Sequence, residues 1–202
     1  MLTLDIPQQL PDGRPFGGYI FDCDGTLANT MPLHYRAWRR LLAEHGMGFS
    51  ETFFYSLGGK PTELIIELLC RDHGLVVDDV AAAVLRKEHY FLDLIHEVKP
   101  IEAVVAVARR WRGVVPLAVA SGGLRRYVEL TLEAIGIRPW FDAVVCIEDY
   151  ARAKPAPDPF LEAARRLNVP PAECLVFEDS PLGIEAAAEA GMQSVFVPRV
   201  KD

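Results

Sequence analysis

Features that mark several large classes of protein are missing from this sequence. Its four cysteines lie far apart and form no C-x-x-C pair, which argues against a disulfide framework or a zinc site and is typical of reduced cytoplasmic thiols. The formal net charge is -7, whereas nucleic-acid-binding proteins normally present a basic face. No apolar run approaches the roughly 18 residues of a membrane span. The first residues show no basic segment followed by an apolar one, so we expect a cytoplasmic protein without signal peptide or membrane partner.

The residues that are present favour an α/β fold. Of the 202 residues, 50% are hydrophobic, which is ordinary for a globular protein and enough for a sizeable core with or without a smaller insert. Short, nearly continuous apolar runs predict strands that are buried on both faces. These runs are 18–22, 116–120, 143–147, 174–177 and 194–197. Helical patterns alternate with them from residue 100 onward, which predicts a parallel sheet.

Local signals mark helices within this α/β part. Apolar residues at helical spacing cover 127–135. Asp158 followed by Pro159 predicts a helix that begins there, with Asp158 as the N-cap. A further helix is predicted between Ser180 and Gly191, because glycine commonly follows the last residue of a helix.

Residues 31–98 have a different character. No strand pattern is convincing there, and the segments 33–43, 62–70 and 80–95 are typical of helices. An ordinary connection between two strands is far shorter than this block. We therefore predict an inserted helical cap. The predicted division is a core of residues 1–29 and 99–202 and a cap of residues 30–98.

Polar side chains follow the carboxyl ends of four predicted strands. In chain order they are Asp22 and Asp24, then Ser121 with Gly122 and Gly123, then Lys154, then Glu178 and Asp179. Ligands of an open parallel sheet bind outside the carboxyl ends of its strands, so we expect these residues to meet in space. Cys23 alternates away from its acidic neighbours along the strand and is predicted to lie in the core.

This set of residues suits phosphate chemistry. Several carboxylates in one crevice repel one another, and Mg²⁺ relieves the repulsion because it prefers oxygen ligands and often shares them with a substrate phosphate. We therefore predict Mg²⁺ at the four acids Asp22, Asp24, Glu178 and Asp179. Lys154 adds a second cation, and the Ser121 hydroxyl and the amides of the Gly122–Gly123 turn can donate to phosphate oxygens. Taken alone, Asp22 and Asp24 could cap a turn and Lys154 could be a surface lysine. These interpretations do not account for the other polar residues that follow the strands.

Four motifs in this order resemble the haloacid dehalogenase superfamily. They are D-x-D-G-T-L from residue 22, Ser-Gly at 121, K-P-x-P-D-x-F from 154 and E-D-S-x-x-G-I from 178. Any one of them is weak evidence, but the four together at strand ends are specific. The resemblance covers about residues 18–198. The helical insert is similar to the small cap of the subfamily that includes β-phosphoglucomutase and fructose-1-phosphate phosphatase.

The resemblance implies a role for each matching residue. Asp22 would be the nucleophile that forms an aspartyl-phosphate, and Asp24 would protonate the leaving oxygen and then activate water. The remaining implied roles are Mg²⁺ binding by Asp22, the Asp24 carbonyl and Asp179 with Glu178 alongside, and phosphoryl binding by Ser121 and Lys154. Dehalogenases of the superfamily lack the second aspartate, so Asp24 favours a phosphoester substrate over a haloacid.

The cap residues leave two interpretations open. His34 is either structural or matches a cap histidine of β-phosphoglucomutase, and a histidine there can tune a neighbouring acid. Lys87 belongs either to a solvated charged face or to a lysine–histidine pair known from the family. Lys60 lies in the loop 57–62, which is either a plain turn or, as in the family, faces the substrate.

Two departures from the family pattern lie near the expected hinge. Asn29 stands where most relatives have an aspartate, and Lys99-Pro100-Ile101 replaces the usual Pro-Gly at the return from the cap. Both therefore bear on cap motion more than on chemistry.

We predict an α/β protein with a Rossmann-like core and a helical cap. Its predicted function is Mg²⁺-dependent hydrolysis of a small phosphorylated metabolite such as fructose 1-phosphate, by a monomer or weak homodimer. The main alternative is a mutase of the β-phosphoglucomutase type, whose cap needs a cation for a second phosphate. The arginine that does this in β-phosphoglucomutase matches the uncharged Thr62, although Lys60 is nearby. A non-catalytic phospho-ligand binding protein has no use for a nucleophile paired with an acid.

Overall fold

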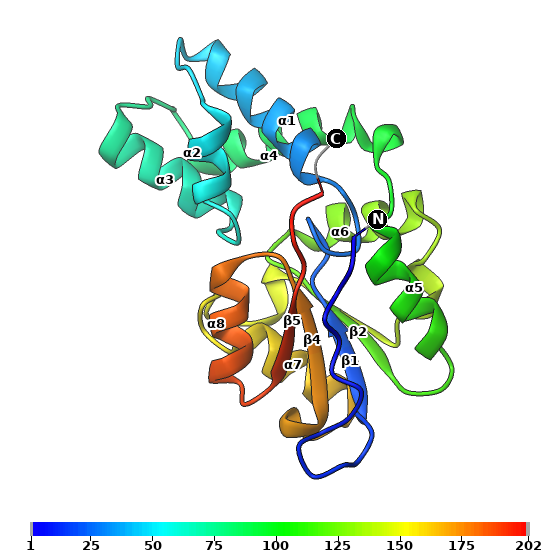
Figure 1. The fold of residues 1–202 in the computed structure, drawn as a ribbon. Coiled ribbons are helices and arrows are strands. Elements are labelled where there is room, and N and C mark those ends of the chain that lie inside the picture. The colour runs from blue at the N-terminus through cyan, green and yellow to red at the C-terminus, as the bar shows by residue number, and fades with distance from the viewer. Residues whose placement is uncertain (1, 201–202) are drawn as a thin grey trace.

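The core of the protein is a five-stranded parallel sheet (Figure 1). The computed structural model describes residues 2–200. The strands are β1 Gly18–Phe21, β2 Leu117–Ala120, β3 Ala143–Val145, β4 Cys174–Glu178 and β5 Gln193–Phe196. They lie in the order β3-β2-β1-β4-β5, and every neighbouring pair is parallel. All five predicted strands are thus confirmed, with ends shifted by one or two residues.

Both faces of the sheet are covered, as the continuous apolar runs predicted. Along β1, Tyr19 and Phe21 point to one face, and Ile20 points to the other. The first face packs on α5 Glu102–Trp111 and α6 Arg125–Ala134, and the second on α7 Asp158–Leu167 and α8 Pro181–Glu189. Three 3-10 turns belong to the core, Arg138–Trp140, Ile147–Asp149 and Pro171–Glu173, and a fourth, Ile95–Glu97, lies at the end of the inserted block. Cys23 is fully buried, as predicted.

One helix start differs from its prediction. Asp158 is the first residue inside α7, and Pro157 occupies the cap position. The Asp158 carboxylate binds the guanidinium group of Arg152 at 2.7 Å and accepts a bond from the Arg152 backbone N–H, so it is not available to the amides of its own helix. At α8 the prediction is confirmed, because the Ser180 hydroxyl accepts from the Gly183 amide at 3.0 Å.

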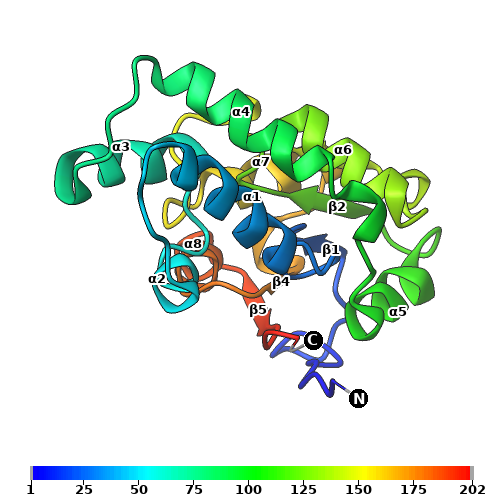
Figure 2. The same cartoon turned by 90° about the horizontal axis from the view of Figure 1, so that it is seen from above.

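The inserted block is helical. It contains α1 Met31–Glu44, α2 Glu51–Ser56, α3 Thr62–His73 and α4 Val80–Leu92. Trp38, Leu42 and Ile66 are buried members of an apolar cluster formed by these helices and the loops between them. The predicted helices are confirmed, whereas α2 was missed because six residues are too few to show a helical period. Figures 1 and 2 show the block above the carboxyl ends of the strands. The domain boundaries at 30 and 98 stay a prediction.

Two chain segments that join the block to the core lie side by side. The backbone N–H of Asn29 donates to the Lys99 carbonyl at 2.9 Å, and the backbone N–H of Ile101 donates to the Leu27 carbonyl at 2.9 Å. The two positions that depart from the family pattern therefore face each other at the crossing between core and cap.

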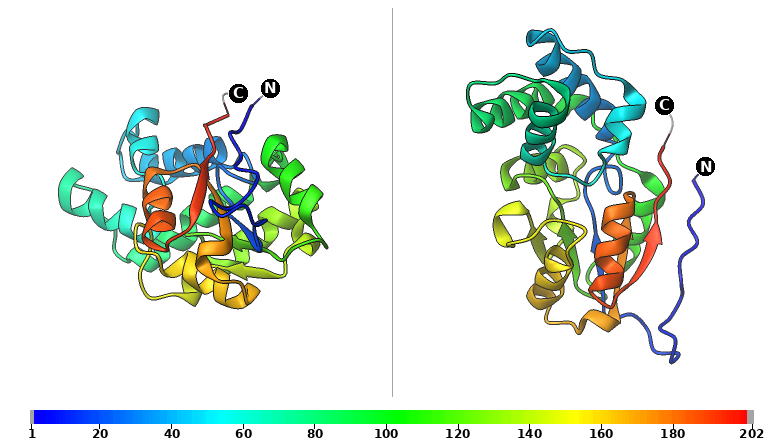
Figure 3. Two further views of the ribbon diagram at one scale, coloured as in Figure 1. Left: turned by 60° about the horizontal axis from the view of Figure 1, so that its bottom comes forward. Right: turned by 90° about the vertical axis from the view of Figure 1, so that its left-hand side faces the viewer.

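A third connection comes from the segment after β5, which rises from the sheet to the cap (Figure 3). The Arg199 guanidinium lies 3.4 Å from the centre of the Tyr55 ring and forms an ion pair with Glu51. The segment after β5 thus contacts α2 of the helical block. Within residues 2–200, no helix has the length and apolar character that a bilayer crossing requires.

Candidate active site

The carboxyl ends of the strands bring the predicted core residues together. Because β1 and β4 are neighbours with Phe21 opposite Phe177, Asp22 and Glu178 come to adjacent positions. Lys154 Nζ lies 2.7 Å from Asp22 Oδ1 and 2.7 Å from Glu178 Oε2, and it also donates to the Ala120 carbonyl. Asp22, Lys154 and Glu178 are all nearly inaccessible to solvent. This ion triad joins strand ends that lie far apart in the sequence.

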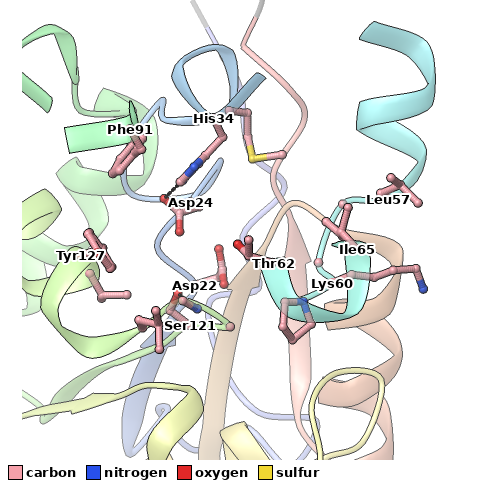
Figure 4. A pocket seen from close by; sticks show the side chains of 18 of the residues that line it. Asp22, Asp24, His34, Leu57, Lys60, Thr62, Ile65, Phe91, Ser121 and Tyr127 are labelled. Atoms are coloured by element: carbon pink, nitrogen blue, oxygen red, sulfur yellow. Dashed lines mark hydrogen bonds and ion pairs between the residues drawn. The ribbon is translucent and has the colours of Figure 1, made fainter. Parts of the chain in front are cut away.

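All of the predicted site residues line one pocket between the core and the cap (Figure 4). The core contributes Asp22, Asp24, Ser121, Gly122, Gly123, Lys154, Glu178 and Asp179, and the cap contributes His34, Lys60 and Lys87. Apolar side chains, among them Phe91 and Leu57, complete the wall. A pocket with a few converging polar groups on an apolar wall is typical of a small-molecule site.

The pocket residues that the core contributes form one wall, the core wall, and those of the cap form the cap wall. The core wall carries more negative charge than Lys154 can balance. Oxygens of Asp22, Glu178 and Asp179 lie within 4.8 Å of one another. Burial is the main cause that raises the pKa of Asp22 to about 8, and the Glu178 charge adds to it against the opposing Lys154. Burial, followed by the charges of Asp22 and Glu178, raises the pKa of Asp179 well above its ordinary value. Carboxyl groups that resist ionisation next to a lysine need a further cation, and an all-oxygen donor set fits Mg²⁺.

Glu178 is positioned by the start of α8. The Ser180 amide and hydroxyl both donate to Glu178 Oε1, at 2.9 and 2.8 Å. A Cβ atom at Gly183 would lie 2.0 Å from Glu178 Cδ, so the glycine of the fourth motif makes room for the carboxylate. On the cap side, a Cβ at Gly59, where φ is +81°, would lie 2.7 Å from Ser180 Oγ. Ser180 therefore touches both walls of the pocket.

Asp24 interacts with the first cap helix. The Thr30 hydroxyl donates to Asp24 Oδ1 at 2.6 Å, and His34 Nε2 lies 3.2 Å from the same oxygen. Lys87 Nζ lies 2.9 Å from His34 Nδ1. Since an ammonium group can only donate, Nδ1 accepts, and the ring proton sits on Nε2 and is donated to Asp24. Burial alone would raise the pKa of Asp24, but His34, the Thr30 bond and the Lys87 charge lower it to about 2.

Lys87 is buried and connects two parts of the cap wall. Besides His34, it donates to Glu88 Oε1 at 2.9 Å, and Thr62 Oγ1 donates to the same oxygen at 2.8 Å. The His34 ring stacks on Phe91 with 4.0 Å between ring centres. The solvated-face interpretation of Lys87 is therefore wrong, since only 3% of this residue is exposed.

The remaining predicted residues differ in how they meet the pocket. Ser121 is buried, and its Oγ accepts from the Gly123 amide at 3.1 Å. That amide is already bonded, so only part of the predicted turn is left to donate to phosphate. Figure 4 shows the ammonium group of Lys60 pointing away from Asp22 and Asp24, although the residue belongs to the pocket wall.

Sequence reasoning missed several polar residues of the pocket region. Thr30, Glu88 and Tyr127 were not singled out, and Thr62 was noted only for its lack of charge. Thr30 directly precedes α1 and could have been found as a candidate helix cap. Glu88 and Thr62 are separated by 26 residues on different helices, so no local pattern announces their contact.

Comparison with known proteins shows the family. A family model described as a haloacid dehalogenase-like hydrolase matches residues 16–191. The chain is 38% identical over 182 residues to fructose-1-phosphate phosphatase YqaB of Escherichia coli (strain K12), which covers 90% of this chain and 96% of that protein. It is also 31% identical over 185 residues to validoxylamine A 7'-phosphate phosphatase of Streptomyces hygroscopicus subsp. limoneus, with 91% of this chain and 86% of that protein covered.

Solved structures agree with this result. CbbY from Rhodobacter sphaeroides in complex with phosphate superposes with a TM-score of 0.84 at 27% identity, over 92% of this chain and 87% of that one. A β-phosphoglucomutase from Clostridium difficile superposes with a TM-score of 0.81 at 25% identity, over 89% and 83% of the two chains. The fold therefore also occurs in a β-phosphoglucomutase.

Proposed function

Because the chain belongs to the haloacid dehalogenase-like hydrolases and is a phosphatase of that family, we propose that it hydrolyses the monophosphate of a small sugar, such as fructose 1-phosphate, with Mg²⁺ as cofactor. The observation that carries the proposal is the juxtaposition of Asp22, bound by Lys154, with Asp24, bound by Thr30 and His34, in one pocket. Similarity to a fructose-1-phosphate phosphatase, a phosphorylated carbohydrates phosphatase and a hexitol phosphatase supports a sugar phosphate as the substrate.

The chain's own residues suit a two-step transfer. Lys154 binds Oδ1 of Asp22, which leaves the other carboxylate oxygen to attack phosphorus. The bond from phosphorus to the sugar oxygen breaks, and that oxygen takes a proton from Asp24 as the sugar leaves. Asp24 then removes a proton from water, which attacks the aspartyl-phosphate and releases inorganic phosphate. Asp22 is restored as a carboxylate and Asp24 as the acid.

For this role Asp24 has to hold a proton when the sugar leaves, whereas its surroundings lower its pKa and favour the carboxylate form. The Thr30 hydroxyl and His34 Nε2–H both point their hydrogens at Oδ1, so they orient the carboxyl group. The other oxygen, Oδ2, then carries the exchanging proton toward the leaving group.

The residues that would hold Mg²⁺ are Asp22, Asp179 and the backbone carbonyl of Asp24, with Glu178 alongside. When bound, the ion supplies positive charge that offsets the carboxylates and the transferring phosphoryl oxygens. Lys154 and Ser121 would contact those oxygens from the protein side, since both are buried and line the pocket together with Asp22.

Hydrolysis is favoured over the mutase alternative by the charges of the cap wall. A mutase needs a cap cation for a second phosphate, and the described pocket wall offers only Lys60 and Lys87 on that side. Lys87 is already bound to His34 and Glu88, and Lys60 points outward. A second phosphate would therefore meet the Glu88 carboxylate without a free positive charge.

The test is to assay the purified protein with Mg²⁺ against a panel of sugar monophosphates while following free phosphate. In parallel, β-glucose 1-phosphate with a trace of glucose 1,6-bisphosphate is offered, and glucose 6-phosphate is followed. We expect free phosphate from at least one sugar monophosphate and little glucose 6-phosphate. Rapid formation of glucose 6-phosphate without phosphate release would show a mutase instead.

A further inference from the structure

One buried carboxylate in the pocket has no part in the chemistry described above. Glu88, on α4, is 6% exposed and lines the pocket together with Thr62, the first residue of α3. Figure 4 shows Thr62 at the pocket with Asp22 and Asp24. Among residues 2–200, the side-chain hydrogen bonds given to Glu88 come from Lys87 and Thr62, and both end on Oε1. The second oxygen, Oε2, receives neither of them.

The protonation of Glu88 follows from its surroundings. Burial would raise its pKa, but the charge and hydrogen bond of Lys87, together with His34 and Thr62, lower the pKa below its ordinary value. Glu88 is therefore an ionised carboxylate that can only accept hydrogen bonds. A carboxylate oxygen at the pocket wall loses its water when a ligand fills the pocket, so the ligand has to bring a donor in exchange.

We propose that Glu88 and Thr62 form a hydroxyl-binding subsite that reads the sugar part of the substrate. Oε2 of Glu88 accepts from one hydroxyl of the leaving group, and Thr62 Oγ1, whose hydrogen is given to Glu88, accepts from another. Carboxylate and hydroxyl acceptors bind neutral hydroxyl groups and repel a second phosphate. This proposal rests on the proposed function, because the subsite selects among phosphate monoesters. It adds the chemical class of the leaving group, which carries neutral hydroxyl groups.

The placement of the subsite agrees with this task. Lys87 links Glu88 to His34, and His34 contacts Asp24, so the subsite and the acid–base residue share one hydrogen-bonded chain. A sugar whose phosphate lies at Asp22 and whose bridging oxygen lies at Asp24 would direct its hydroxyls to the cap wall. Site groups built to bond a substrate hydroxyl discriminate strongly against analogues that lack it.

The experiment compares Glu88→Gln, Thr62→Val and Thr62→Ser with the wild type. Fructose 1-phosphate, fructose 1,6-bisphosphate and p-nitrophenyl phosphate, which has no hydroxyl groups, are the probes. For Glu88→Gln we expect the ratio of kcat/KM for fructose 1-phosphate over p-nitrophenyl phosphate to fall about ten- to hundred-fold, mainly through KM. Discrimination against the bisphosphate should weaken. Thr62→Val should act in the same direction, and Thr62→Ser should keep the wild-type ratio.

Glu63→Gln is the matched control, because Glu63 is an exposed carboxylate next to Thr62. It should leave every ratio unchanged. If Glu88→Gln slows both monoesters equally, the carboxylate only supports Lys87 and the proposal is overturned. An unchanged ratio in a folded Thr62→Val overturns it as well, even where Glu88→Gln fails to fold. If the wild type cleaves p-nitrophenyl phosphate but no sugar phosphate, the proposed function itself is wrong, and the subsite with it.

Discussion

The core wall and the cap wall of the pocket differ in how far their charged side chains neutralise one another. On the core wall, carboxylates outnumber the lysine, and two of them, Asp22 and Asp179, have raised pKa values. On the cap wall, the buried cation Lys87 stands beside the buried anion Glu88 at 2.9 Å. An unbalanced wall attracts a metal ion and the phosphate that comes with it. A balanced wall suits neutral groups, so under our proposal the chemistry takes place at the core wall and the substrate is selected at the cap wall.

The walls also differ in how they are built. The core residues sit at the ends of strands whose register is fixed by the sheet, as in the pairing of Phe21 with Phe177. The cap residues project from helices that pack on an apolar cluster of their own. Changes on the core wall should therefore affect every substrate, whereas changes on the cap wall should affect some substrates more than others.

The largest loss is expected for Asp22→Asn. An amide cannot attack phosphorus as a carboxylate does, so we expect no turnover and no phosphoenzyme with any phosphate ester. Acid-quench trapping after a pulse of labelled substrate measures the phosphoenzyme. Near-native turnover in this variant would favour direct attack by water on the substrate.

Removal of metal ions should abolish activity just as fully, but reversibly. The crowded carboxylates of Asp22, Glu178 and Asp179 lose their counter-charge when EDTA removes the ion. Activity should return when Mg²⁺ is added in excess, and Ca²⁺ at equal concentration serves as the control for ionic charge alone. Full activity after exhaustive chelation would refute the metal assignment and the charge contrast between the walls.

Asp24→Asn should retain the nucleophile and lose acid–base help. General acid–base catalysis contributes roughly 10²- to 10⁴-fold in rate, so a loss of that size in kcat is expected. The loss should be smaller for p-nitrophenyl phosphate, whose leaving group needs little protonation. Equal losses for both esters would mean that Asp24 mainly positions other groups.

Gly183→Ala tests how tightly the core wall is built. Alanine normally favours a helix over glycine, but here its methyl group overlaps Glu178, and overpacking typically costs about 1–3 kcal/mol. We expect a lower midpoint in chemical unfolding and reduced activity toward all substrates. Gly48→Ala is the control, since a Cβ at Gly48 meets nothing within 4 Å. A stabilised, fully active Gly183→Ala protein would show that Glu178 has room to move.

The smallest effect concerns the pH dependence of stability. The folded protein lowers the pKa of Glu88, so its contribution to stability is fully present above the ordinary pKa of glutamate and is lost as the pH falls through the folded value. The free-energy difference of unfolding between wild type and Glu88→Gln should therefore shrink below about pH 4. Urea unfolding of both proteins from neutral to acidic pH measures it, with Glu63→Gln as control. A difference that grows in acid would mean that Glu88 is protonated in the folded state.

The sequence predicted the core wall better than the cap wall, and the reason is physical. Parallel strands end at a common edge, so an acid after one strand and a lysine after another must converge, as Asp22 and Lys154 do. Helices impose no such edge. The contact of Thr62 with Glu88 and the outward direction of Lys60 depend on how helices pack, which the sequence does not state locally.

Local competition also limited the predictions. Asp158 had the right position for a helix cap, but Arg152 binds its carboxylate more strongly than helix amides do. The six-residue α2 was too short to show a period. In contrast, Ser180 was predicted to begin α8 and does so, because its hydroxyl can accept from the Gly183 amide while it donates its own hydrogen to Glu178.

The contact between Gly59 and Ser180 limits how the cap loop can diverge in evolution. A side chain at Gly59 would press on Ser180, whose hydroxyl and amide hold Glu178, so a change made in the cap would disturb the core wall. Lys60, one residue later, points outward and can be exchanged without that effect. A lineage that acquires new substrates is thus expected to vary Lys60 and Thr62 while it keeps glycine at position 59, and a library designed to redirect the enzyme should do the same.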